Sequence, residues 1–297
     1  MNKNEIESYK KAGEIVARTK EFAKIFIKKD MLLIEIAEKI EEDIIKLGGK
    51  IAFPTNLSLN EVTAHYTPSS KDKTKANGLL KIDLGVEING CIGDSAFSLD
   101  LSDDGRFKDL IEENEKALEN AILKLKSEAN PLVKNIGSAI QEVVEKTNYS
   151  VIRNLSGHSL GKNLIHAGLT ISNYRNDNKT PLKNMAIAIE PFLTEGVGEV
   201  YDSSVSEIFK LEGEGNVRDK DAREILKFIK ENYNTKPFCK RWLEKQGFQK
   251  VDFSLKTLVS QGIVHNYPVL IEQSQKPVSQ FEETLIFYDD KVVVTTR

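Results

Sequence analysis

The spacing of apolar side chains predicts that the chain begins with two amphipathic helices. Over residues 4–28, apolar side chains recur at the three- to four-residue spacing of one helix face. The same period returns over residues 31–47 and stops at Gly48, and glycine is a common residue just past the end of a helix. We therefore expect two consecutive helices before any strand.

An alternation of apolar and polar residues replaces the helical period over residues 79–100 and predicts two strands. Asn89 and Gly90 lie in the middle of this stretch, and Asn-Gly is the strongest two-residue signal for a β-hairpin. The preceding residues 53–78 are rich in Pro, Asn and Ser, so we expect turns and loops there.

Two further helices and a second group of strands follow in the same order. They are expected at residues 106–127, 131–147, 151–171 and 185–194. Asn130 before Pro131 is typical of an N-cap followed by the first helical residue. Because the order of two helices and then strands occurs twice, we expect a duplicated α/β unit.

A segment with a different composition and hydrophobic pattern interrupts the second unit. Residues 207–268 are highly charged, and helical patterns occur in them at 218–233, 236–246 and 252–261. The strand pattern then returns near the C-terminus. We expect one main domain made of residues 1–206 and 269–297, with residues 207–268 inserted as a helical subdomain.

Composition limits the classes of function. The 42 basic residues against 45 acidic ones give a net charge of −3, so we expect no nucleic acid as substrate. Cys91 and Cys239 match no metal or redox spacing and suit a reducing compartment. The N-terminus lacks the apolar core of a signal peptide, and no segment approaches the roughly 18 apolar residues of a membrane span. We expect a cytoplasmic protein without a membrane partner.

Two carboxylates stand in the predicted hairpin. If Asn89 and Gly90 form a two-residue turn, Gly85 pairs with Asp94, and Asp83 becomes the diagonal neighbour of Asp94 on the same face. Like charges at that distance are unfavourable unless a cation lies between them or one group is protonated. Asp is also disfavoured in strands, so the pair predicts a metal site.

The second unit carries corresponding carboxylates. Glu190 stands six residues after Asn184 at the end of an apolar strand, as Asp83 stands six residues after Asn77. Glu282 begins the strand after the insert, and we expect these groups to converge. Because adjacent strand residues face opposite ways, we expect Glu283 to lie on a solvated face.

The four histidines, His65, His158, His166 and His265, add a further class of ligand. Three lie in predicted loops beside the acidic strands, and His158 follows Gly157 in such a segment. Four carboxylates and one imidazole suit a pair of divalent Mn, Fe, Co or Zn ions. Such a pair activates water for hydrolysis, although spacing alone does not separate amide from phosphate substrates.

Several segments together resemble the type 2 methionine aminopeptidases. They are AFPTNLSLNEVTAHYTP, KIDLGVEINGCIGDSA, NLSGHSLGKNLIHAG, AIAIEPF and QFEETLIF, with NYNTKPFCKRWL and LKTLVSQGIVHNYPVL in the insert. The absence of an N-terminal extension resembles the archaeal form. The resemblance implies an α+β protein with the pseudo-symmetric pita-bread fold and a helical, winged-helix-like insert.

The resemblance also implies the ligands of two divalent ions, Co, Mn, Fe or Zn. The five ligands would be Asp83, Asp94, His158, Glu190 and Glu282. Asp94 and Glu282 would bridge the ions, Asp83 would chelate one, and His158 with Glu190 would complete the other. Glu190 would also accept a proton from the attacking water.

The substrate residues follow from the same resemblance. His65 would contact the substrate near its amino end, and His166 would hydrogen-bond the scissile carbonyl or the oxyanion. Phe53, His65 and Ile165 would line the pocket for the methionine side chain, since an apolar, polarizable thioether suits such a lining. The expected reaction is removal of the initiator methionine from nascent polypeptides, with a preference for a small second residue.

This chain departs from the family at one visible position. Glu283 replaces the usual histidine of Phe-Glu-His-Thr, and we expect altered metal affinity with intact ligands. Two alternatives remain, a proline-directed peptidase of the same fold and a non-catalytic binding platform, although all five ligands are present here. We expect a monomer whose partners are nascent polypeptide N-termini, with the ribosome as a candidate.

Overall fold

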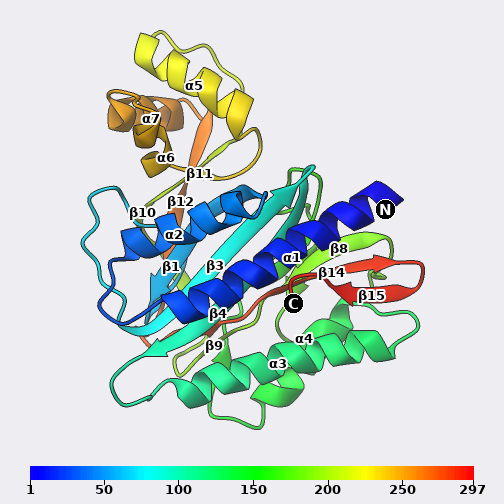
Figure 1. Cartoon of the computed structure of the whole chain (residues 1–297). Coiled ribbons are helices and arrows are strands. Elements are labelled where there is room, and N and C mark those ends of the chain that lie inside the picture. Colours follow the sequence, from blue (N-terminus) through cyan, green and yellow to red (C-terminus); the bar gives the residue numbers. More distant parts are fainter.

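The computed structural model describes residues 1–297, and its first half contains the expected pair of helices over a sheet (Figure 1). The elements are α1 (Lys3–Phe26), α2 (Leu33–Lys46), β1 (Lys50–Leu59), β2 (Val62–Ala64), β3 (Gly78–Ile88) and β4 (Cys91–Leu101). β1, β3 and β4 form an antiparallel sheet in that order, and α1 and α2 pack on it. The apolar faces of these helices, including Ile36 and Ile40, are fully buried against Leu80 and Ile82 of β3.

The loop expected at residues 53–78 is wrong in two places, because β1 runs through Phe53 and Pro54 as far as Leu59 and β2 occupies Val62–Ala64. β1 pairs with β3 in an interrupted register, with shifts between Ile51 and Phe53 and between Phe53 and Asn56. These irregularities let a strand accommodate a proline, which cannot donate to the sheet. Residues that are typical of turns, such as Pro54, therefore lie within the strand β1.

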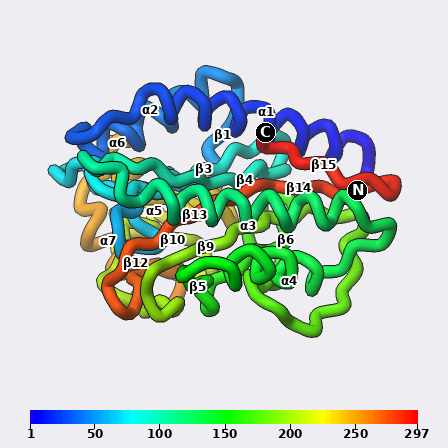
Figure 2. Tube along the Cα trace, turned by 90° about the horizontal axis from the view of Figure 1, so that it is seen from below, coloured from blue at the N-terminus to red at the C-terminus, as the bar shows by residue number.

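The second half repeats this architecture. Its elements are α3 (Lys108–Ser127), α4 (Val133–Val144), β5 (Ser150–Val151), β6 (Ser156–Leu160), β7 (Thr170–Ser172), β8 (Met185–Ile189), β9 (Phe192–Thr194), β13 (Val278–Gln280), β14 (Glu283–Tyr288) and β15 (Lys291–Val294). The main sheet has the order β15-β14-β8-β6-β7, and a small sheet has the order β13-β9-β5. Figure 2 shows β3, β4 and β14 between the α1–α2 layer and α4.

The start of α4 differs from the prediction. Asn130 is not its N-cap, because the helix begins at Val133 and the cap position is Leu132. The preceding residues instead pair with a distant loop, with a bridge between Leu132 and Pro181. Pairing with a remote segment therefore overrides the local capping signal.

A helical unit with its own core lies between the strands β10 (Val200–Leu211) and β12 (Val264–Glu272). It contains α5 (Lys220–Asn232), β11 (Phe238–Cys239), α6 (Lys240–Lys245) and α7 (Val251–Ser260), seen together at the top of Figure 1. The helix predicted from residue 236 begins four residues later, since Phe238 and Cys239 pair with β10 as a short strand. β10 and β12 form one antiparallel pair that continues into the rest of the molecule through β2.

The two half-sheets meet at an isolated bridge between Ala96 and Glu282. The Glu282 N–H donates to the Ala96 carbonyl at 2.9 Å, and the Ala96 N–H donates back at 3.3 Å. This bridge places the carboxylates of both halves at one seam of the structure.

None of the helices combines the length and the apolar composition that a membrane-spanning helix requires.

Candidate metal centre and substrate pocket

The β3–β4 hairpin has the predicted register. Ile88 pairs with Cys91 across a two-residue turn, and Gly85 pairs with Asp94. Asp83 lies two residues further along β3, so both Asp side chains reach the same face of the sheet. A side chain at Gly85 would meet the Phe53 ring at 2.2 Å, so glycine is required where the ring packs beside the site.

The second sheet supplies the other candidate ligands. His158 lies on β6 rather than in a loop, and it pairs with Ala188 of β8. Glu190 directly follows β8, and Glu282 directly precedes β14, whose first residue pairs with Ile189. The two glutamates therefore occupy corresponding ends of neighbouring antiparallel strands.

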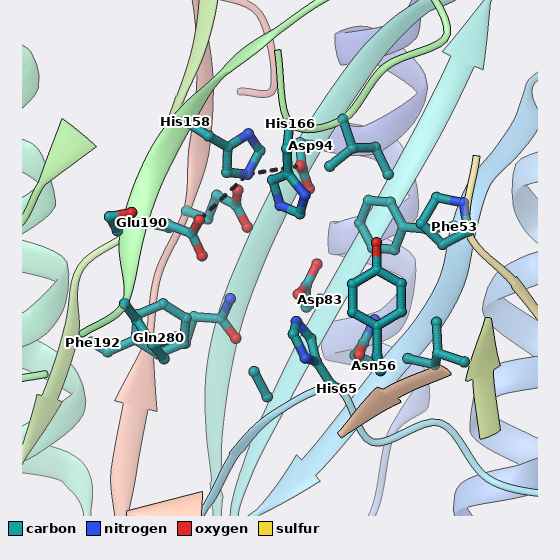
Figure 3. A pocket seen from close by; sticks show the side chains of 18 of the residues that line it. Phe53, Asn56, His65, Asp83, Asp94, His158, His166, Glu190, Phe192 and Gln280 are labelled. Atoms are coloured by element: carbon teal, nitrogen blue, oxygen red, sulfur yellow. Dashed lines mark ion pairs between the residues drawn. The ribbon is translucent and has the colours of Figure 1, made fainter. Parts of the chain in front are cut away.

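Asp94 and Glu190 point toward His158, and Asp83 lies in the same pocket (Figure 3). The His158 Nε2 atom lies 3.4 Å from Glu190 Oε1 and 3.8 Å from Asp94 Oδ2. Asp94, His158 and Glu282 each offer a ligand atom within 4.8 Å of the others. Asp83 and Glu190 line the same pocket. Residues from both halves thus meet at the seam between the sheets.

The carboxylates oppose one another electrostatically. Burial raises the pKa of Asp83 to about 7. Burial also raises the pKa of Asp94, Glu190 and Glu282 well above the ordinary value, and repulsion among the carboxylates adds to the effect. Burial and the neighbouring His166 lower the pKa of His158 to about 3, so this imidazole is neutral and free to act as a ligand.

The residues fit a bound cation. No Lys or Arg lines the pocket to balance its carboxylates. The buried carboxylate oxygens Asp83 Oδ1 and Asp94 Oδ1 have no hydrogen-bond partner, and the neutral His158 ring turns its Nε2 atom toward Asp94 and Glu190. Buried polar atoms without partners are costly, and divalent cations take this set of oxygen and nitrogen donors.

The pocket beside these groups has a volume of about 390 Å³ and includes Phe53, His65, Ile165 and His166. The His65 Nδ1 atom lies 3.3 Å from the Pro268 carbonyl, and burial lowers the pKa of His65 to about 4. The His166 ring packs edge-on against His158 at 4.4 Å between centroids. All substrate residues expected from the sequence therefore lie in one pocket, whereas the exposed His265 does not line it.

Sequence reasoning missed several residues of the pocket, including Asn56, Ile208, Pro237, Tyr267 and Gln280. Gln280 had a usable signal, since a residue two positions before Glu282 shares its face when the strand is extended. The others come from an unrecognised strand and from the insert, and no local pattern marks them.

Glu283 contradicts the expectation of a solvated face. Glu283 is only 7% exposed, and Lys20 Nζ of α1 donates to its Oε1 atom at 2.9 Å. The Thr296 hydroxyl also donates to it, and Arg297 Nε donates at 3.2 Å. Helix α1 and the C-terminal residues cover this side of β14, so the face away from the ligands is buried as well.

Comparison with known proteins agrees with this site. Residues 7–225 match the family described as metallopeptidase family M24. The methionine aminopeptidase of Pyrococcus horikoshii is 41% identical over 99% of this chain and 100% of its own length. The chain belongs to this family, among the methionine aminopeptidases. Methionine aminopeptidase 2 of Lodderomyces elongisporus is 34% identical over 99% of this chain and 66% of its own length.

The family membership confirms the pita-bread fold. A solved structure of a thermophilic Arx1 has the same fold, with a TM-score of 0.84 and 17% identity over 99% of this chain and 91% of its own. This methionine aminopeptidase is a metal-dependent hydrolase that removes the N-terminal methionine from polypeptides.

Proposed function

We propose that this methionine aminopeptidase works with two divalent metal ions, Co, Mn, Fe or Zn. The ligands would be Asp83, Asp94, His158, Glu190 and Glu282. The observation that carries the proposal is charge: the four carboxylates face one another with no Lys or Arg side chain in the pocket. Ionised, they carry four negative charges, which one divalent ion would balance only by half. Two ions would neutralise the set.

Bound there, the ions would lower the pKa of a water molecule and polarise the scissile carbonyl. Glu190 faces the pocket beside His158, and we assign to it the acceptance of the water proton and its transfer to the leaving amine. His166 stands at the pocket wall, where its N–H would donate to the oxyanion of the tetrahedral intermediate. His65 would orient the amino end of the substrate.

We assign the apolar part of the pocket to the methionine side chain. Phe53 and Ile165 provide an aromatic and an aliphatic surface, which suits a thioether. The confined pocket would favour a small second residue on steric grounds. The helical unit between β10 and β12, together with the similarity to a methionine aminopeptidase 2, supports assignment to type 2.

We further propose that residues 207–268 form the type 2 insert and that residues 1–206 and 269–297 form the catalytic domain. The separate apolar core of α5, α6 and α7 supports this division. The two cysteines are free and buried, which suits a reducing cytoplasm where new chains emerge. We propose a monomer that acts on nascent chains, with the ribosome as a candidate partner.

The test compares two peptides, Met-Ala-Ser and an Xaa-Pro peptide, with Mn- or Co-loaded protein with and without chelator. We expect chelator-sensitive release of methionine from the first peptide alone. Cleavage confined to the Xaa-Pro bond would instead indicate a proline-directed peptidase, and inactivity on both with metal bound would favour a binding platform.

Metal stoichiometry tests the two-ion proposal separately. Titration calorimetry with Mn should give two ions per chain in the wild type and fewer in Asp83→Asn. A single ion per chain at saturation would refute the dinuclear proposal without affecting the assignment as an aminopeptidase.

A further inference from the structure

A buried ion pair connects the helical insert to the hairpin that carries Asp83 and Asp94. Lys236 Nζ donates to Glu87 Oε2 at 2.6 Å, and the two side chains are only 10% and 5% exposed. The other Glu87 oxygen accepts from the Gly90 N–H at 2.8 Å. Lys236 lies just before β11, so the pair joins the insert to the tip of the β3–β4 turn.

A third segment joins the same point. The Thr235 hydroxyl donates to the Asn163 carbonyl, and the Asn163 N–H donates to the Gly90 carbonyl at 2.8 Å. A Cβ at Gly90 would lie 2.8 Å from the Lys162 side chain, so this approach depends on glycine. The insert, the hairpin tip and the loop around Asn163 therefore form a closed set of contacts.

The insert segment around Lys236 and the loop around Asn163 each contribute residues that line the methionine pocket. Pro237 directly follows Lys236 and lines the pocket. Ile165 and His166 follow Asn163 by two and three residues and line it too. Ile208 pairs with Cys239 at the end of the same insert segment and forms another part of the wall. The residues that contact the hairpin tip, Lys236 and Asn163, are thus only one to three positions in sequence from the wall residues Pro237, Ile165 and His166.

We infer that Lys236 and Glu87 are positioning residues that set the width of the methionine pocket by clamping the insert loop and the Ile165 loop to the hairpin tip. The inference rests on the proposed assignment of this pocket to the methionine side chain. Neither residue lines the pocket, so their effect on the substrate would pass through Pro237 and Ile165. A pocket wall held by a rigid support discriminates between side chains better than a mobile one.

The test is the ratio of kcat/KM for Met-Ala-Ser to kcat/KM for Leu-Ala-Ser, measured with the Mn-loaded full chain. We expect Lys236→Met to lower this ratio about fivefold, because a loosened wall discriminates less between shapes of similar volume. Lys245→Met is the matched control. Lys245 also joins the insert to the rest of the chain, through Glu38 at 2.7 Å, but its side chain is 51% exposed and lines no pocket. The Lys245→Met variant should have the same ratio of the two kcat/KM values as the wild type.

Removal of Lys236 alone leaves the Glu87 carboxylate buried without its cation, which by itself destabilises a fold. The double variant Lys236→Met/Glu87→Met removes both charges and keeps the measurement interpretable. A lowered ratio in this folded double variant supports the inference. A wild-type ratio in it overturns the inference, and failure of the wild type to cleave Met-Ala-Ser would refute the proposed function instead.

Discussion

The ion pair behind Glu282 gives the sharpest test of the electrostatics of this fold. Lys20 Nζ lies 2.9 Å from Glu283 Oε1 and 2.9 Å from Ser95 Oγ, and the paired side chains are 9% and 10% exposed. Removing one partner of a buried pair typically costs about 3–5 kcal/mol, since the other charge is left uncompensated. Arg297 and Thr296 still contact Glu283, so for Lys20→Met we expect the lower end, about 3 kcal/mol.

Urea unfolding with excess chelator measures this loss without any contribution from metal binding. The midpoint should fall while the slope stays constant, because the surface exposed on unfolding does not change. Lys24→Met is the matched control, one turn further along α1. Lys24 pairs with Glu21 at 2.8 Å, but the side chains are 45% and 69% exposed. An exposed pair contributes about 1 kcal/mol or less.

The Lys20→Met variant should also weaken metal binding. Ser95 receives a hydrogen bond from Lys20 and donates to the Glu282 carbonyl at 2.6 Å, so the pair supports the backbone of a proposed ligand. Loss of such support typically reduces metal affinity about 10- to 100-fold, which calorimetry with Mn detects. Equal stability losses in Lys20→Met and Lys24→Met, with unchanged Mn affinity, would refute the reasoning.

Three further predictions concern single residues. Glu283→His should not raise metal-saturated activity, because this side chain faces Lys20 rather than the metal site; a many-fold rise would show that Glu283 impairs the wild type. His166→Gln should lower kcat on Met-Ala-Ser about 100-fold with little change in KM, as expected for loss of an oxyanion donor, and a rise in KM alone would contradict that role. Gly13→Ala should lower the melting temperature, because its Cβ would lie 2.1 Å from the Thr295 carbonyl; an unchanged melting temperature would mean that the C-terminal segment moves freely.

The first pair of candidate ligands was predictable because all the information is local. Asn89-Gly90 determines the turn, the turn determines the register, and the register places Asp83 diagonally from Asp94. Predicting that Glu190 and Glu282 lie close together required the internal duplication as well, because the helical unit separates their two strands in sequence. The roles assigned to these residues came from the resemblance and not from the pattern.

The errors share a physical cause, which is that distant pairing outweighed a local signal. Pro54 indicated a loop, yet the bulged register of β1 against β3 accommodates it. Asn130 and Pro131 indicated a helix start, yet the bridge between Leu132 and Pro181 delays it. In each case the partner segment is remote in sequence, and no local window contains it.

Charged residues show this limit most clearly. Glu87 on an alternating strand and Lys236 in a charged insert both have the sequence features of solvated surface, but they lie 149 positions apart and bury each other. Arg241 is similar, fully buried and held by Glu41 of α2 at 2.8 Å. Desolvation makes such pairs costly unless their geometry is good, so their presence at two of the contacts of the insert argues for fixed placement rather than for stability alone. A helical unit docked in this way can contribute Pro237 to a pocket whose chemistry lies entirely in the other part of the chain.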